Sequence, residues 1–193
     1  MTFTINGLIL AGGRSQRMGT DKANIVLAGK TLLQRCIESL RPQVNELAIS
    51  SNEPSAAVQS CHLPVLADRI SGYPGPLAGI HAGLCHWPDD YVLSVAVDLP
   101  FLPADLVERL SRAIVPGKCC YANTGDGHAL ALLCPPGLHE ALAEALEHNQ
   151  RSVKNWLKAH GTAVHFEDTE TSSLGFNINT PEDLAVAEAK LKN

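Results

Sequence analysis

The chain has 193 residues, of which 45% are hydrophobic, enough to bury the core of one domain and too few for two ordinary ones. Its formal net charge of −5 argues against general affinity for nucleic acid or for an anionic membrane surface. No apolar run approaches the roughly 20 residues that span a bilayer, and the first four residues lack the charged start of a signal peptide, so we expect a cytoplasmic protein.

Apolar runs of strand length alternate with segments of helical period, a pattern typical of an α/β protein with a mainly parallel sheet. Strands are predicted over residues 4–10, 46–50, 64–66, 91–97, 118–122, 129–134 and 162–166. Helices are predicted over residues 31–40, 104–114, 138–148 and 152–158, and from Pro181 to about residue 191. With no repeat and no linker, residues 1–193 form one domain in this interpretation.

The last of these helices has a clear start signal. Thr180 suits the N-cap position, Pro181 the first helical position, and Asp183 the third, where an acidic side chain completes a cap. The six cysteines form no C-x-x-C pair, so we expect reduced and mostly buried thiols, and the eight histidines show no metal-binding spacing.

A loop rich in glycine and basic residues follows the first strand. Its sequence is Leu10-Ala11-Gly12-Gly13-Arg14-Ser15-Gln16-Arg17-Met18-Gly19-Thr20-Asp21-Lys22. Small residues let main-chain N–H groups approach a ligand, and positive charge favours a polyphosphate, so a nucleoside triphosphate is the expected ligand. The loop is not a Walker A motif, and a plain turn between strand and helix is the alternative.

Polar side chains also follow the other predicted strands. Asp98 comes after the buried run 91–97, where a carboxylate suits Mg²⁺, or else caps the next turn. Ser50, Asn52 and Asp68 follow the second and third strands. Ligands of open α/β sheets gather at the carboxyl ends of the strands, so one crevice is expected to collect these groups.

Four motifs in order along the chain resemble the nucleotidyltransferases, and most closely the molybdenum cofactor guanylyltransferases. They are the first loop from Leu10 to Lys22, Tyr73-Pro74-Gly75-Pro76-Leu77-Ala78-Gly79, Val97-Asp98-Leu99-Pro100, and Phe176-Asn177-Ile178-Asn179-Thr180-Pro181-Glu182-Asp183-Leu184. The resemblance implies a single-domain, three-layer, Rossmann-like nucleotidyltransferase fold.

The resemblance also implies roles for individual residues. Lys22 neutralises triphosphate charge, Arg17 helps to hold pyrophosphate or the acceptor phosphate, and Asp98 holds magnesium. The expected GTP-binding set is Leu10, Ala11, Gly12, Gly13, Lys22, Ser50, Asn52, Asp68, Gly75, Pro76, Leu77 and Asp98.

Several of these assignments have alternatives. The family places an asparagine after the second strand; here either Asn52 replaces it or Ser50 makes a reduced contact. Asp68 could instead pair with Arg69. The segment from Gly75 to Gly79 is expected to begin a helix with Pro76 in its first turn, or else to be only a tight turn into residues 80–85.

The expected acceptor side comes from the C-terminal part of the chain. Asn177 and Asn179 lie two positions apart on a segment expected to be extended, so their amides face the same side. We expect them to contact the acceptor or the metal; the alternative is that they are only turn residues. Arg151 and Lys154 could add a basic edge for a pterin phosphate, or be ordinary surface residues. Asp126 and His128 are interpreted as part of a hairpin turn.

The expected function is Mg²⁺-dependent transfer of GMP from GTP to molybdopterin, with release of pyrophosphate. Transient contacts with cofactor-biosynthesis proteins and acceptor molybdoenzymes are expected, and contacts with nucleic acid or membrane are not. The alternatives are the same chemistry with CTP or a sugar phosphate, and a nucleotide-binding module that does not catalyse.

Overall fold

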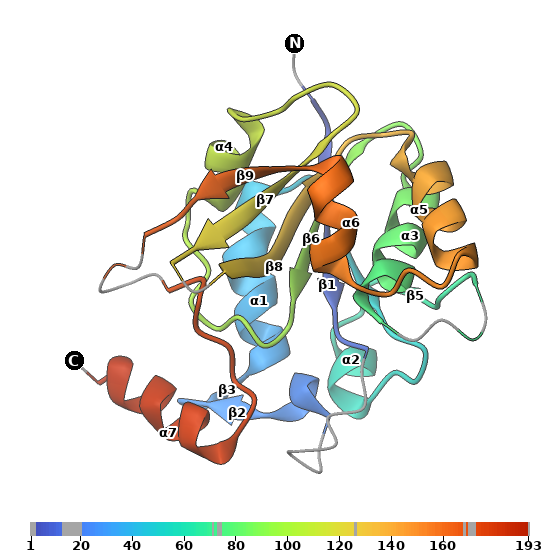
Figure 1. Ribbon diagram of the computed structural model, residues 1–193. Coiled ribbons are helices and arrows are strands. Elements are labelled where there is room, and N and C mark those ends of the chain that lie inside the picture. The colour runs from blue at the N-terminus through green and yellow to red at the C-terminus, as the bar shows by residue number, and fades with distance from the viewer. Residues whose placement is uncertain are drawn as a thin grey trace.

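A sheet of seven strands organises the protein (Figure 1). The computed structural model describes residues 3–12, 21–70, 72, 75–125, 127–167, 169 and 173–192. The strand order is β5-β4-β1-β6-β8-β7-β9, and only the pairings of β8 are antiparallel. The prediction of a mainly parallel sheet is confirmed. The strands are β1 (Ile5–Leu10), β4 (Leu47–Ser50), β5 (Val65–Leu66), β6 (Tyr91–Ala96), β7 (Cys119–Thr124), β8 (Gly127–Cys134) and β9 (Gly161–His165).

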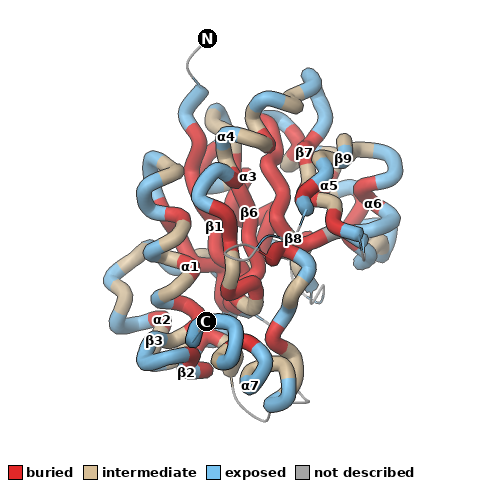
Figure 2. The backbone as a smooth tube through the Cα atoms, turned by 90° about the vertical axis from the view of Figure 1, so that its left-hand side faces the viewer, coloured by how far each residue is buried: buried red, intermediate tan, exposed pale blue. Residues whose placement is uncertain are grey.

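Helices cover both faces of the sheet and give three layers (Figures 1 and 2). The central strand β1 is buried throughout, and its side chains alternate between two apolar cores. Ile9 packs with α1 (Leu32–Leu40) and α4 (Leu106–Ser111), whereas Leu8 and Leu10 pack with the helices of the other face. Those helices are α3 (Pro76–His86), α5 (Leu138–Glu147) and α6 (Val153–His160).

A small hairpin between β1 and α1 was not predicted. It pairs β2 (Val26–Leu27) with β3 (Lys30–Thr31), and follows the short 3-10 helix η1 (Lys22–Asn24). Strands of two residues carry no period to detect, and the turn uses Ala28 at φ 47° before Gly29 at φ 81°. Thr31 then begins α1 with a capping box that Gln34 completes.

Other boundaries differ by a few residues from those expected. The helix α4 ends at Ser111 rather than near residue 114, because the amides of Ala113 and Ile114 donate to carbonyls three residues back, a tighter turn than the α-helix. The short helix α2 (Ala56–Ser60) was not predicted, and a second 3-10 helix, η2 (Arg41–Gln43), follows α1. The predicted hairpin between β7 and β8 is confirmed, since Thr124 pairs with Gly127.

The helix α3 lies close against β1 and β4 because glycine faces the sheet. A Cβ built on Gly79 would lie 2.4 Å from Ser50 Oγ and 3.0 Å from Leu10 Cδ2. Pro76 occupies the first turn of α3, as the sequence predicted, and Gly75 precedes it at φ 146°, a conformation that side chains rarely adopt. The glycines of this segment therefore set the distance between helix and sheet.

Gly79→Ala should destabilise the protein by about 1–3 kcal/mol, because the added methyl overpacks the core although alanine favours helix formation. Ser50→Ala removes the nearest atom, so the double variant should recover part of the loss. Gly125→Ala is the matched control, since a Cβ there meets nothing within 4 Å. Urea unfolding measures all four variants, and a Gly79→Ala protein as stable as the parent would contradict the packing argument.

Candidate active site

The carboxyl ends of three neighbouring strands form one level edge. Leu10 pairs in register with Ser50 of β4 and with Ala96 of β6. The residues that follow, Gly12, Asn52 and Asp98, therefore begin at the same edge, as the sequence predicted. This edge is at the bottom of Figure 1, where α2 and α7 (Pro181–Lys190) lie beside the hairpin of β2 and β3.

Lys22 lies at the centre of this edge. Its ammonium donates to Asp98 Oδ2 at 2.6 Å and to Asn179 Oδ1 at 2.6 Å. The side chains of Lys22 and Asp98 are 21% and 17% exposed, so the ion pair is largely shielded from water. Two segments that are distant in sequence, those of Asp98 and Asn179, thus meet at the side chain of Lys22.

The backbone of η1 directs Lys22 toward the edge. The carboxylate of Asp21 caps η1 by accepting from the amide of Ala23, and Ala23 is fully buried in the core. The amide of Ile25 then donates to the carbonyl of Lys22 itself. The main chain of Lys22 is therefore held by a cap on one side and by buried packing on the other.

The segment before α7 closes the same edge from the other side. The amide of Ile178 donates to the carbonyl of Asp98 at 3.0 Å, which fixes this segment beside the end of β6. The carboxylate of Asp183 accepts from the amides of Asn179 at 2.8 Å and Thr180 at 2.9 Å, completing the predicted capping box. These bonds, that of Asn179 foremost, lower the pKa of Asp183, and the charge of Lys22 adds to the effect.

A buried thiol packs behind Asp98. Cys36 of α1 lies within hydrogen-bond distance of the carbonyls of Val97 at 3.6 Å and Ala96 at 3.9 Å. Complete burial, with a smaller contribution from Asp98, raises the pKa of the Cys36 thiol to about 12. The thiol is therefore neutral and supports the strand end by packing. All six cysteines are free thiols, and four of them are buried, as expected.

Asn52 and Asp68 hold each other by two hydrogen bonds. Asn52 Nδ2 donates to Asp68 Oδ2 at 2.8 Å, and the amide of Asp68 donates to Asn52 Oδ1 at 2.7 Å. Asp68 is thus paired with Asn52, rather than with its neighbour Arg69 as one alternative proposed. Ser50 is buried beneath Gly79 of α3, so Asn52 is the residue that presents an amide at this edge.

Four of the predicted nucleotide-binding residues are buried, Ser50 among them. Leu10 and Leu77 are 8% and 1% exposed and belong to the core under α3. Ala11 is also buried, and its amide donates to the carbonyl of Ser50. Gly12, by contrast, is exposed at the end of β1, and Gly75 is exposed before α3. Main-chain groups at these two glycines are therefore open to a ligand.

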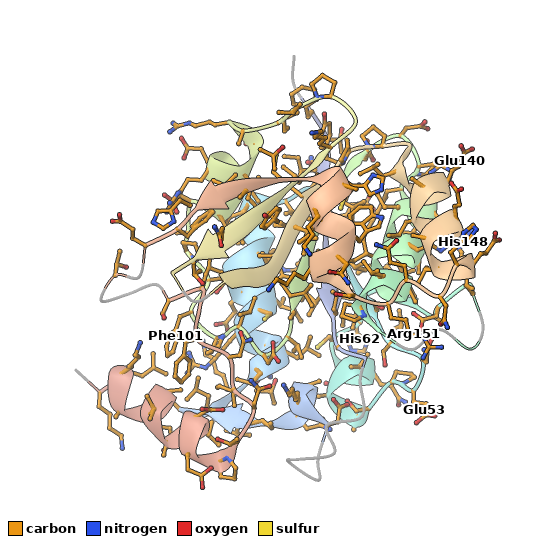
Figure 3. All side chains as sticks on the ribbon, in the orientation of Figure 1. Glu53, His62, Phe101, Glu140, His148 and Arg151 are labelled. Carbon is orange, nitrogen blue, oxygen red and sulfur yellow. The ribbon has the colours of Figure 1, made fainter. Side chains whose placement is uncertain are left out.

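Some predicted residues are not placed at the edge. Gly13 and Arg17 lie outside the described residues. Arg151 is exposed and donates to Asn149 Oδ1, and it lies on the opposite side of Figure 3 from Phe101 and α7. Lys154 is exposed in the first turn of α6, and Asn177 is exposed just before the buried Ile178. The structure thus brings Asn179 to Lys22 and Asp98, and it does not bring Arg151 there.

The sequence-based set also omitted a residue. Asp183 was predicted as a helix cap, and the structure shows that the same carboxylate fixes the backbone of Asn179. The spacing of four residues between them was a usable signal, because a residue at the third helical position reaches back to the cap. The link from Lys22 to Asn179 spans 157 positions and had no local signal.

Metal chemistry at this edge would rest on one carboxylate. In the described ranges no group of three or more His, Cys, Asp or Glu side chains could hold a metal ion. Asp98 and Asn179 are hard oxygen donors, which suits a magnesium ion that keeps water and phosphate as its other ligands.

No helix in the described part of the chain is long and apolar enough to cross a membrane.

A mainly parallel sheet with helices on both faces and polar side chains at the carboxyl ends of its strands defines an α/β protein whose ligands bind at that edge. The chain belongs to the family described as MobA-like NTP transferase domain, which it matches over residues 7–164.

Individual relatives agree with the family. The chain is 40% identical over 191 residues to the molybdenum cofactor guanylyltransferase of Rhodopseudomonas palustris, covering 94% of this chain and 91% of the relative. It is 37% identical over 187 residues to that of a Shewanella species, covering 94% of both chains. The crystal structure of molybdopterin-guanine dinucleotide biosynthesis protein A from Archaeoglobus fulgidus has a TM-score of 0.78 and 23% identity, covering 97% of this chain and 98% of that one.

Asp183→Asn should lower the free energy of unfolding at neutral pH, and the difference from the parent protein should disappear in acid. A carboxyl whose pKa is lowered by folding stabilises the protein above its ordinary pKa of about 3.9, and this stabilisation disappears as the pH falls through the lowered folded-state pKa. Urea unfolding between pH 7 and pH 3 compares the variant with the parent protein. Glu182→Asn, in the same helical turn, is the control. A difference between parent and Asp183→Asn that does not change with pH would contradict the assignment.

Proposed function

We propose that this chain transfers GMP from GTP to the molybdopterin form of the molybdenum cofactor and releases pyrophosphate. Relatives that are 37–40% identical over most of both chains are named molybdenum cofactor guanylyltransferases, which supports this reaction over the alternatives with CTP or a sugar phosphate. The observation that carries the proposal is the convergence of Lys22, Asp98 and Asn179 at the carboxyl edge of the sheet.

The triphosphate of GTP is proposed to lie over the end of β1. Gly12 is exposed there, and Lys22 is the first cationic residue after Gly12 that the structure describes. Gly13 and Arg17 would complete the phosphate site from the same loop, as the family motif implies. Positive charge and main-chain N–H groups are the groups that stabilise a polyphosphate.

A magnesium ion is proposed at Asp98, with Asn179 as a second oxygen donor. The fit rests on the fact that both oxygens already lie 2.6 Å from one cationic nitrogen. When bound, the ion would neutralise phosphate charge that builds up during transfer. With the phosphate charge neutralised by the ion, the residues of the chain would have only to position the reactants.

The reaction requires no general base from the chain. A terminal phosphate acceptor is already ionised at neutral pH, so its oxygen can attack the α-phosphate of GTP directly. A new phosphoanhydride bond forms at that phosphorus, and the bond to pyrophosphate breaks. Lys22 would then stabilise the developing negative charge, and alignment would supply most of the rate.

Guanine is proposed to lie between Asn52 and the start of α3. The pair of Asn52 and Asp68 offers fixed polar groups, and Gly75 leaves the main chain before Pro76 open. The acceptor is proposed on the side of Asn177 and Asn179. Arg151 and Lys154 are exposed cations on another part of the surface and would contribute only if a large acceptor reached them.

We also propose a cytoplasmic setting with transient protein contacts. A cofactor that is made and then inserted elsewhere must be handed over, so contacts with cofactor-biosynthesis proteins and acceptor molybdoenzymes follow from the proposed reaction. The net charge of −5 gives no reason to expect a nucleic-acid partner.

Asp98→Asn should reduce kcat/KM for GTP on the order of 100- to 1,000-fold while the protein stays folded, because the amide keeps the shape and loses the charge. Pyrophosphate release in the presence of molybdopterin measures the effect. Asp89→Asn is the control, because Asp89 is an exposed carboxylate at the other end of β6. Near-parental activity of Asp98→Asn at ordinary magnesium concentrations would exclude the metal role.

GTP should exceed CTP in kcat/KM by roughly a hundredfold or more, because a site built for guanine leaves polar groups unpaired when cytosine enters. A turnover assay with all four nucleoside triphosphates, each with molybdopterin and with a sugar phosphate, measures base and acceptor preference together. Equal use of CTP would overturn the guanylyl assignment and leave the nucleotidyl transfer chemistry in place. No turnover with any pair would favour a module that only binds nucleotide.

A further inference from the structure

The ammonium of Lys22 lies between two oxygens of the kind that bind divalent cations. It lies 2.6 Å from Asp98 Oδ2 and 2.6 Å from Asn179 Oδ1, and both oxygens are hard donors. The Asp98 side chain is only 17% exposed, so water alone solvates its charge poorly. Lys22 is therefore the counter-charge of the carboxylate.

We infer that Lys22 and the divalent metal compete for the same two oxygens, so that the metal site becomes available only when a triphosphate draws Lys22 away. The inference rests on the proposed function in one respect, the assignment of Asp98 and Asn179 as metal ligands. It adds an order of events: metal alone binds weakly, and nucleotide and metal bind together.

The physical reason is charge repulsion over a short distance. A metal ion and an ammonium that share the same two oxygens would lie within a few ångströms of each other, where like charges repel strongly. The phosphates of a nucleotide offer Lys22 several negative oxygens in exchange for one carboxylate and one amide. Because coupling between two ligands is reciprocal, metal must then also strengthen nucleotide binding.

The main chain around Lys22 suits an exchange of this kind. The backbone is fixed by the cap of η1 and by the buried Ala23, whereas the long side chain reaches the edge through rotatable bonds. On the other side, Asp183 accepts from the backbone amide of Asn179, a hydrogen bond in which the side chain of Lys22 takes no part. The two oxygens are thus held in place while the ammonium can leave.

Binding of Mn²⁺ to the nucleotide-free protein tests the inference without any turnover. Free Mn²⁺ is followed by electron paramagnetic resonance as metal is titrated into the parent protein and Lys22→Met. The variant should bind Mn²⁺ at least roughly tenfold more tightly, because a competing charge within a few ångströms has been removed. Lys30→Met is the control for loss of one charge, since Lys30 pairs with Glu38 on the exposed surface, and it should bind as the parent does.

A second substitution separates competition for the same oxygens from simple repulsion at a distance. Adding Asn179→Ala to Lys22→Met should weaken Mn²⁺ binding several-fold, because a neutral donor is lost and no charge changes. If Lys22→Met binds no more tightly than the parent, or if Asn179→Ala has no effect in that background, the inference is wrong.

Thermal unfolding keeps the test independent of how well one variant folds. Lys22→Gln retains an N–H donor for one of the oxygens and serves as the second variant. Mg²⁺ without nucleotide should raise the Tm of the charge-removed variants and leave that of the parent nearly unchanged. An equal rise in the parent overturns the inference. These outcomes concern metal binding alone, so they stand apart from a failure to use GTP, which would overturn the proposed reaction instead.

Discussion

The ion pair of Lys22 and Asp98 is the interaction on which the organisation of the site depends. A carboxylate at the end of a buried strand, 17% exposed, requires a positive partner, because an unpaired charge in that position would cost several kcal/mol. The sheet supplies the carboxylate and cannot supply the cation. The cation therefore arrives from η1, and the segment before α7 closes over both by donating from Ile178 to the carbonyl of Asp98.

Close packing beneath the edge is the second requirement. The carboxyl ends of β1, β4 and β6 lie level because their pairings are in register, and Gly79 lets α3 approach Ser50 and Leu10. A larger residue in α3 would move the helix away from the strand ends. The start of α3 would then move relative to Asn52 and Asp68. The packing distance between α3 and the sheet therefore determines how far these two polar side chains lie from the start of the helix.

Local patterns predicted the elements well and the contacts between them poorly. The alternation of strand and helix periods, the cap of α7 and the position of Asp98 after a buried strand were all readable from neighbouring residues. The contact between Lys22 and Asn179 joins positions 157 apart, and depends on how η1 and α7 pack. The burial of Ser50 beneath Gly79, which leaves Asn52 exposed at the edge, likewise involves another element and had no local signal. Strands β2 and β3 were missed because two residues carry no period.

In the proposed cycle Asp98 would have a cation beside it in every state, Lys22 as the structure shows it and a metal ion once Lys22 has moved to the phosphates. Partial burial makes the bare carboxylate costly, so the loss of Lys22 and the arrival of the proposed metal would be coupled to each other. In the proposed reaction a triphosphate would serve both steps, because its negative charges would attract the ammonium of Lys22 and its oxygens are donors that suit a magnesium ion. The free protein would then bind metal weakly, and metal and nucleotide would each strengthen the binding of the other.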